Sequence, residues 1–194
     1  MINHIPFYYV RHGQTDWNLN KRLQGNSDIP LNETGIAQAH AAKDKMFGTS
    51  IATICCSPLI RARKTADIIN TVLNTKIIEI DELKECDFGD REGTLNNTWI
   101  KNWLAGDDST APEGIEKYDA FIARATAAIN KATAHDGPVL IVAHGGVYIP
   151  ANNTLSPNEQ WSLPNAQPVL HTPPQAGVRS SNQSQQAHWT LKIL

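Results

Sequence analysis

Two histidines and two arginines lie just beyond strand-like runs of the sequence, and these residue types could bind and transfer a phosphoryl group. Arg11 and His12 directly follow the first apolar run, and His144 follows another. Arg61 lies one turn into the helix predicted after a third run. Guanidinium groups match the geometry of phosphate oxygens, and a neutral imidazole is a nucleophile. The four side chains therefore predict a phosphate site that contains a histidine.

The elements that must position these residues alternate along the chain. Short, continuously apolar runs are typical of strands covered on both faces. Helical patterns fill the gaps between the runs, and this alternation predicts an α/β fold with a mainly parallel sheet. The strands are predicted at 6–10, 51–56, 76–80 and 138–143, with weaker candidates at 168–172 and 189–194.

Three longer helices are predicted. One starts at Asn32 and runs through about Phe47, and another is amphipathic over 118–132. For the third, Ser57 is the predicted N-cap and Pro58 the first helical residue. Ligands of an open α/β sheet bind beyond the carboxyl ends of its strands, where helix N-termini also favour anions. The four side chains are therefore expected to converge at that edge.

Each of these residues also has an ordinary explanation. A single histidine such as His12 is most often a surface or core residue without a chemical role. Arg61 could be a solvated helix residue, and His144, which precedes two glycines, could belong to a turn. Their joint placement at strand ends favours a shared site over these separate explanations.

Composition and charge disfavour several functional classes. The length of 194 residues suits one domain, and the net charge of -2 provides no basic field for nucleic acid or anionic lipid. No apolar run approaches the ~20 residues of a membrane helix, and no signal-peptide pattern opens the chain. Three cysteines, of which Cys55 and Cys56 are adjacent, make a poor disulfide framework, and Cys55 and Cys56, at the end of a predicted strand, are expected to act as small buried hydrophobes. We expect a cytoplasmic protein without nucleic-acid or membrane partners.

Five segments in order resemble the signature segments of the histidine phosphatase superfamily, the phosphoglycerate-mutase-like group. The resemblance is strong over residues 6–146 and weak afterwards. It implies a three-layer α/β/α sandwich whose mostly parallel central sheet has one antiparallel strand. It also implies one domain over 1–194 with a cap insert at about 94–136. The segments are RHGQTDWN (11–18), RLQGNSDIPLNETG (22–35), SPLIRARKTA (57–66), LKECDFGDREG (83–93) and VAHGG (142–146).

The resemblance also implies roles for individual residues. His12 matches the nucleophile that becomes phosphohistidine, and Glu85 matches the carboxyl that protonates the leaving alcohol. Arg11, Arg61 and His144 match the groups that hold the phosphate and stabilise its charge. The remaining phosphate-binding matches are Asn18, Gln24, Gly25 and Gly145.

The chemistry of such a site is consistent with these residue types. Phosphoryl transfer depends mainly on positioning and on cations around the transferred oxygens. The imidazole must be neutral, so one ring nitrogen is expected to bond to backbone near Gly13. No histidine spacing or acidic cluster suggests a metal, so neither a metal nor a cofactor is expected. Glu92 and Asp87 compete with Glu85 for the role of proton donor, although Glu92 better suits ordering the loop before Gly93.

Three functions are compatible with the sequence. The leading hypothesis is a metal-independent phosphatase acting on monoesters of small phosphorylated metabolites. The alternatives are a phosphoglycerate mutase and a catalytically idle phosphate-binding regulatory module. A mutase normally carries a longer and more basic insert to hold a bisphosphate. Here the cations between Glu85 and His144 are only Arg91, Lys101, Lys117, Arg124 and Lys131.

The chain departs from the family after His144. Pro150 is expected to break the long helix that relatives have there. A homodimer partner could cover the sheet surface that a shortened helix exposes. Residues 163–170 resemble the family's final strand, and the polar run 175–186 is expected to be a mobile loop.

Overall fold

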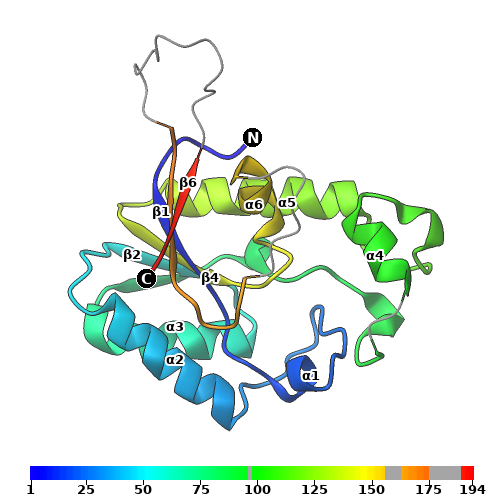
Figure 1. The fold of residues 1–194 in the computed structure, drawn as a ribbon, viewed down its shortest axis with the longest axis horizontal. Helices are drawn as coiled ribbons and strands as arrows, with labels where there is room; N and C mark the ends of the chain where they lie inside the picture. Colours follow the sequence, from blue (N-terminus) through cyan, green and yellow to red (C-terminus); the bar gives the residue numbers. More distant parts are fainter. Residues whose placement is uncertain (96–97, 156–162, 175–188) are drawn as a thin grey trace.

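The computed structural model describes residues 1–95, 98–155, 163–174 and 189–194, and a six-stranded sheet forms its centre (Figure 1). The strand order is β3-β2-β4-β1-β5-β6. The pairs β1–β4, β2–β4 and β2–β3 are parallel, whereas β5 is antiparallel to both of its neighbours. The sheet therefore has one strand running against the other five, which confirms the predicted fold class. The strands are β1 (Phe7–Arg11), β2 (Thr53–Cys56), β3 (Lys76–Glu79), β4 (Val139–Ala143), β5 (Val169–Thr172) and β6 (Thr190–Ile193).

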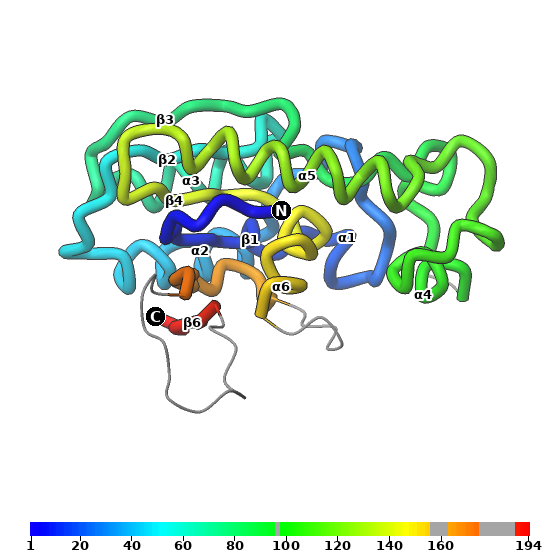
Figure 2. Tube along the Cα trace, turned by 90° about the horizontal axis from the view of Figure 1, so that it is seen from above, coloured from blue at the N-terminus to red at the C-terminus, as the bar shows by residue number. Residues whose placement is uncertain are grey.

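Helices cover both faces of the sheet and complete the three layers (Figures 1 and 2). One face packs against α2 (Glu33–Met46) and α3 (Ile60–Leu73), and the other against α5 (Tyr118–Thr133) and α6 (Ile149–Leu155). Shorter helices lie in the connections. They are α1 (Asp16–Leu19), α4 (Thr98–Leu104) and the 3-10 helices η1 (Asp81–Leu83), η2 (Gly89–Arg91) and η3 (Asp108–Thr110).

Strand residues alternate between the two apolar layers because successive side chains point to opposite faces of a sheet. Tyr9 and Cys55 belong to the cluster with α5, whereas Val10 and Cys56 belong to the cluster with α2 and α3. All three cysteines are free and buried, and for Cys55 and Cys56 this burial was predicted. Burial raises the pKa of the Cys55 thiol to about 11 and that of Cys56 to about 12. Both thiols therefore stay protonated and act as small core side chains.

The helix predicted over 32–47 forms as expected, with the Asn32 side chain accepting a hydrogen bond from the Gly35 amide at 2.9 Å. The predicted N-cap of α3 is wrong, because α3 begins at Ile60 rather than after Ser57. The Asp28 carboxylate accepts from the Ile60 amide at 2.6 Å and so satisfies this helix end from another loop. The Ser57 hydroxyl accepts from the Leu59 amide at 3.3 Å and is also hydrogen-bonded to an imidazole of the site described below.

Two predictions about the last third of the chain also need correction. Pro150 does not break the helix after His144, because it is the second residue of α6, where a proline removes no needed amide. The strand predicted over 163–170 begins only at Val169, and the preceding residues form a loop. The predicted mobile loop at 175–186 lies outside the described residues. No helix in the described parts of the chain combines the length and apolar character that a bilayer span requires.

Candidate active site

The carboxyl ends of β1 and β4 bring the two histidines of the site together. The strands pair in parallel with Arg11 opposite Ala143, and the His12 amide donates to the Ala143 carbonyl at 2.9 Å. The next residue on each strand is a histidine, and the rings of His12 and His144 have centroids 5.2 Å apart. Strand register alone therefore juxtaposes two residues that are far apart in sequence.

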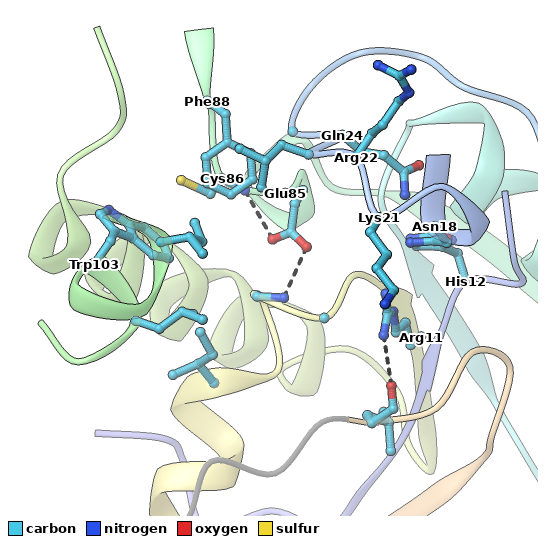
Figure 3. A pocket seen from close by; sticks show the side chains of 18 of the residues that line it. Arg11, His12, Asn18, Lys21, Arg22, Gln24, Glu85, Cys86, Phe88 and Trp103 are labelled. Carbon is cyan, nitrogen blue, oxygen red and sulfur yellow. Dashed lines mark hydrogen bonds between the residues drawn. The ribbon is translucent and has the colours of Figure 1, made fainter. Parts of the chain in front are cut away.

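A cavity of about 930 Å³ opens beside His12 at this edge of the sheet (Figure 3). Most of the residues expected in the site contribute to its wall. His144 does not, because it is fully buried next to the His12 ring. The expected residues on the wall are Arg11, His12, Asn18, Gln24, Gly25, Arg61, Glu85 and Gly145.

The protonation state of His12 follows from its contacts. Its Nδ1 lies 2.7 Å from the Gly13 carbonyl oxygen, which can only accept, so Nδ1 carries the proton and Nε2 the lone pair. Burial lowers the pKa of His12 well below its usual value, and the positive charges of Arg61 and Arg11 lower it further. The imidazole is therefore neutral at pH 7 with a lone pair on Nε2, and the predicted hydrogen bond to backbone at Gly13 is confirmed.

Close packing fixes the backbone around His12. A Cβ at Gly13 would lie 2.4 Å from the Gly35 carbonyl oxygen, so only glycine fits at this position. The Gly13 amide donates to Thr65 Oγ1 at 3.1 Å. From the far end of the chain, Asn165 Nδ2 donates to the His12 carbonyl at 2.8 Å. The ring of His12 is thus held on a backbone tied to three different segments.

Two arginines, the buried Arg61 and the half-buried Arg11, flank His12, and neither has a carboxylate salt-bridge partner among the described residues. Arg61 donates to the Gly25 carbonyl at 2.7 Å and to the Ser27 carbonyl at 2.8 Å, and Arg11 donates to the Leu163 carbonyl at 3.1 Å. Neither forms a salt bridge within the described residues, and the Nε of each lacks a hydrogen-bond partner there. Burial lowers the pKa of Arg61 to about 10, so it remains a cation at pH 7. Glu85 acts on both arginines only through space, and no carboxylate among the described residues pairs directly with either guanidinium. Guanidinium groups held in this way can bind an anion.

Glu92 positions the loop that holds Arg61. Its carboxylate accepts hydrogen bonds from the amides of Asn26 and Ser27, each at 2.7 Å. Gly25 has a φ of +52°, and a Cβ there would lie 2.0 Å from Glu92 Oε1. Glu92 therefore orders a loop, as predicted, although the loop it holds is 25–27 rather than only the residues before Gly93.

Glu85 lies on the cavity wall with its carboxylate fixed from two sides. Oε2 accepts from the Gly146 amide at 3.0 Å, and Oε1 accepts from the Cys86 amide at 3.1 Å. A Cβ at Gly146 would lie 2.3 Å from Glu85 Oε1, so this glycine leaves the space that the carboxylate fills. Figure 3 shows Glu85 between the side of the cavity with His12 and the side with Trp103. A carboxyl group placed there can exchange a proton with the bridging oxygen of a bound ester.

The two amide side chains present donors to the cavity. Asn18 Oδ1 accepts from the Thr15 amide at 3.1 Å, and Gln24 Oε1 accepts from Thr15 Oγ1 at 2.9 Å. Because both carbonyl oxygens are engaged by Thr15, the NH₂ groups are the atoms that can donate to an anion. This arrangement suits the phosphate-binding roles expected of Asn18 and Gln24.

Sequence reasoning missed several residues of this site. The contact between Glu85 and Gly146, the second glycine of VAHGG, is not among the predictions from the sequence. Ser57 Oγ lies 2.8 Å from His144 Nε2, although the Ser-Pro pattern suggested a helix cap. Lys21 and Arg22 add two cations to the cavity wall. They lie close in sequence to Gln24, an expected site residue, and this proximity could have identified them.

Within the described residues, no three histidine, cysteine or acidic side chains gather in a way that could hold a metal ion. Separately, the cavity wall carries positive charge on side chains. Arg11, Lys21, Arg22 and Arg61 supply it.

Comparisons with known proteins show which proteins this chain is similar to. The chain is 42% identical over 138 residues to the uncharacterized phosphatase PhoE of Bacillus subtilis, covering 70% of this chain and 69% of that protein. It is 36% identical over 152 residues to the probable phosphoglycerate mutase GpmB of Proteus mirabilis, covering 73% and 70%.

Solved structures show the same architecture. A phosphoglycerate mutase from Thermus thermophilus superposes with a TM-score of 0.70 at 29% identity, covering 86% of this chain and 92% of that one. A mycobacterial glucosyl-3-phosphoglycerate phosphatase superposes with a TM-score of 0.75 at 24% identity and 97% coverage of both chains, a likeness of fold. Residues 7–162 match the family model of the histidine phosphatase superfamily (branch 1). This chain belongs to the histidine phosphatase superfamily.

Proposed function

We propose that this protein is a phosphatase that hydrolyses phosphate monoesters through a phosphohistidine on His12. The observation that carries the proposal is the neutral imidazole of His12 beside the buried Arg61 and the half-buried Arg11, neither of which has a carboxylate salt-bridge partner among the described residues. A phosphate dianion bound there would neutralise Arg11 and Arg61 and bring its phosphorus to Nε2. Positioning and charge stabilisation are what phosphoryl transfer requires.

In the first step, His12 Nε2 attacks phosphorus while the bond between phosphorus and the ester oxygen breaks. The departing oxygen takes a proton from Glu85 and leaves as a neutral alcohol. Arg11 and Arg61 stabilise the negative charge on the three non-bridging oxygens. His144, held by Ser57, supports the His12 side of the site.

In the second step, water attacks the phosphorus of phosphohistidine. The Glu85 carboxylate accepts a proton from this water, and the bond between nitrogen and phosphorus breaks to release inorganic phosphate. Neutral His12 and protonated Glu85 are restored, so the cycle balances without a metal or cofactor. The amide contacts that fix Glu85 serve both proton transfers.

Phosphoglycerate mutase is the rival function because relatives carry that name. The cations of the insert argue against it. Arg124 pairs with Glu116 at 2.6 Å and Lys131 with Glu82 at 3.0 Å, and neither lies on the cavity wall. A bisphosphate would therefore meet no cation from the described part of the insert. We expect phosphate release to exceed isomerisation by far.

The test combines turnover and trapping. Wild-type protein should release phosphate from p-nitrophenyl phosphate, and His12→Ala should abolish this release without changing the melting temperature. His40→Ala, an exposed histidine on α2, is the matched control and should keep full activity. With a ³²P-labelled monoester, acid-labile and base-stable label should be trapped on His12. Label on a serine or a cysteine, or an active His12→Ala protein, would refute the proposal.

A second measurement separates hydrolase from mutase. Wild-type protein is incubated with 3-phosphoglycerate and 2,3-bisphosphoglycerate, and both isomerisation and free phosphate are measured. Isomerisation at ordinary enzyme turnover, roughly 1–10³ s⁻¹, would favour the mutase function instead.

A further inference from the structure

The segment that follows β4 supports two groups of the proposed mechanism at once. We call residues 144–146 the glycine turn. The ring of His144 lies beside that of His12, with centroids 5.2 Å apart, and the Gly146 amide donates to Glu85 Oε2 at 3.0 Å. A shift of the glycine turn would therefore move the support of the proposed proton donor.

The position of the glycine turn depends on backbone hydrogen bonds, because two of its three residues have no side chain to pack. At its end, the Gly146 carbonyl accepts from the Ile149 amide at 2.9 Å. At its start, the His144 carbonyl accepts from the Tyr9 hydroxyl at 2.7 Å. A side chain of β1 thus holds the backbone that leads from the sheet to the Gly146 amide.

Tyr9 is fixed in the role of donor. Its side chain is fully buried, and a buried hydroxyl is costly unless it is hydrogen-bonded. Burial raises the pKa of Tyr9 well above its usual value, and the negative charge of Glu85 raises it further. The hydroxyl therefore keeps its proton at pH 7 and donates it to the His144 carbonyl, which can only accept.

The side chain of His144 has a separate support. Its Nε2 lies 2.8 Å from Ser57 Oγ, and its ring packs beside that of His12. Loss of the Tyr9 hydroxyl would remove a contact of the backbone only. Its effect should therefore reach the glycines, and through them Glu85, more than it reaches the His144 ring.

A second buried tyrosine of the same layer makes a different contact. The rings of Tyr148 and Tyr9 have centroids 5.0 Å apart, and the Tyr148 hydroxyl is hydrogen-bonded to His171 Nε2 at 2.7 Å. This bond ties the residue before α6 to β5 and does not involve the backbone of the glycine turn. Tyr9 and Tyr148 therefore offer the same chemical change, the loss of one buried hydroxyl, with and without the loss of a bond to the turn.

We propose that Tyr9 is a positioning residue for the proton transfer by Glu85, acting through the His144 carbonyl and the Gly146 amide. The inference rests on the proposed phosphatase activity and adds a residue that does not line the cavity. Since a displacement of about 1 Å can cost ~10²-fold in rate, removal of the hydroxyl should cost roughly tenfold on substrates that need the acid. Alkyl phosphates need it, and aryl phosphates need it much less.

The first experiment compares kcat/KM for ethyl phosphate and p-nitrophenyl phosphate. Tyr9→Phe should lose roughly tenfold on ethyl phosphate and clearly less on p-nitrophenyl phosphate. Tyr148→Phe should lower the melting temperature, because His171 loses its partner, while the ratio of the two rates stays at the wild-type value. Tyr8→Phe, the adjacent tyrosine whose side chain packs in the opposite layer, should change neither quantity. Equal losses on both substrates in Tyr9→Phe, or the same selective loss in Tyr148→Phe, would overturn the inference.

A double-mutant cycle tests whether Tyr9 acts through Glu85. In the Glu85→Gln background, Tyr9→Phe should cost no further selective loss on ethyl phosphate, because the acid is already gone. The same loss in both backgrounds would show that Tyr9 acts by another route and would contradict the proposal. Tyr9→Leu, a second variant without the hydroxyl, should reproduce the selective loss, so the result does not depend on one variant folding.

Hydrogen exchange of the Gly146 amide, measured by NMR, tests the link without turnover. Exchange should be faster in Tyr9→Phe by roughly two- to tenfold, the range that one hydrogen bond contributes, and unchanged in Tyr8→Phe. If wild-type protein hydrolyses no monoester while this exchange rises selectively, the proposed phosphatase activity is refuted and the link from Tyr9 to Gly146 stands. Active wild-type protein with unchanged Gly146 exchange in Tyr9→Phe would refute the positioning role and leave the phosphatase activity intact.

Discussion

The guanidinium of Arg124 holds the backbone of Glu85, with Nη2 donating to the Glu85 carbonyl at 3.2 Å. Nη1 of the same side chain donates to the carbonyls of Glu82 and Lys84 at 2.9 and 2.8 Å. The carboxylate of Glu116 fixes the other edge, accepting from Nε at 2.9 Å and from Nη2 at 2.6 Å. One residue of α5 therefore secures the segment that carries Glu85, the proposed proton donor, to the cavity, and we propose that Arg124 is a positioning residue.

Arg124→Lys should impair the proton transfer by Glu85 more than it impairs folding. Lysine keeps the charge but lacks the planar fork that reaches three carbonyls and a carboxylate. Misplacing an acid whose help is worth about 10²–10⁴-fold should cost at least about tenfold on alkyl phosphates. On p-nitrophenyl phosphate, whose leaving group needs little protonation, the loss should be smaller.

The matched control for this variant is Arg63→Lys, which changes an arginine that pairs with Asp67 and Glu79 on the outer side of α3. It should leave both rates unchanged. Equal losses on alkyl and aryl substrates in Arg124→Lys would mean that Arg124 supports the fold without positioning Glu85.

Glu85→Gln and Glu92→Gln should separate the proton donor from the loop-ordering carboxylate. Glu85→Gln removes the acid, so the loss should reach roughly 10²–10⁴-fold on alkyl phosphates and be much smaller on aryl phosphates. Glu92→Gln weakens the bonds to Asn26 and Ser27 and should lower both rates alike through the Arg61 loop. The measurement is the ratio of kcat/KM for the two substrate types. Leaving-group sensitivity in Glu92→Gln rather than Glu85→Gln would reassign the acid.

The buried His171 should make the protein less stable in mild acid. Its Nε2 lies 2.7 Å from the Tyr148 hydroxyl, its ring stacks on Phe7 with centroids 5.0 Å apart, and burial lowers its pKa to about 4. Between pH 6.5 and about 4, the imidazole of His171 becomes protonated in the unfolded chain but stays neutral in the folded chain. The free energy of unfolding should therefore fall as pH decreases through this window, by up to about 3 kcal/mol.

Urea unfolding of wild type and His171→Gln at several pH values checks this expectation. The variant should lose less stability between pH 6.5 and 4, with a slope smaller by up to ~1.4 kcal/mol per pH unit. Above pH 7, where the imidazole is neutral in both states, the variant's offset from wild type should be constant. Identical slopes in the two proteins would show that His171 does not set the acid response.

Chelation should not affect turnover. The charge around the transferred oxygens comes from Arg11 and Arg61, and the described residues form no cluster that could ligate a metal. Phosphate release from p-nitrophenyl phosphate is compared before and after dialysis against EDTA, and the two rates should agree. A loss that added magnesium or zinc restores would contradict the metal-independent mechanism.

The sequence by itself determined the sheet and the central residues of the site, because their signals are local. Strands show as short apolar runs, and the residue after a strand must lie at the sheet edge whatever the rest of the chain does. Parallel pairing of β1 and β4 then brings His12 and His144 together without further information. For the same reason the pairing of His12 Nδ1 with backbone at Gly13 was predictable from neighbouring residues.

Only the tertiary structure decided which atoms complete the site. Ser57 has the pattern of a helix cap, yet its hydroxyl contacts His144, and Asp28 caps the helix instead. The Gly146 amide meets Glu85 across 61 residues, and Asn165 meets the His12 carbonyl across 153. Such contacts depend on how loops pack in three dimensions, and no local periodicity encodes that packing.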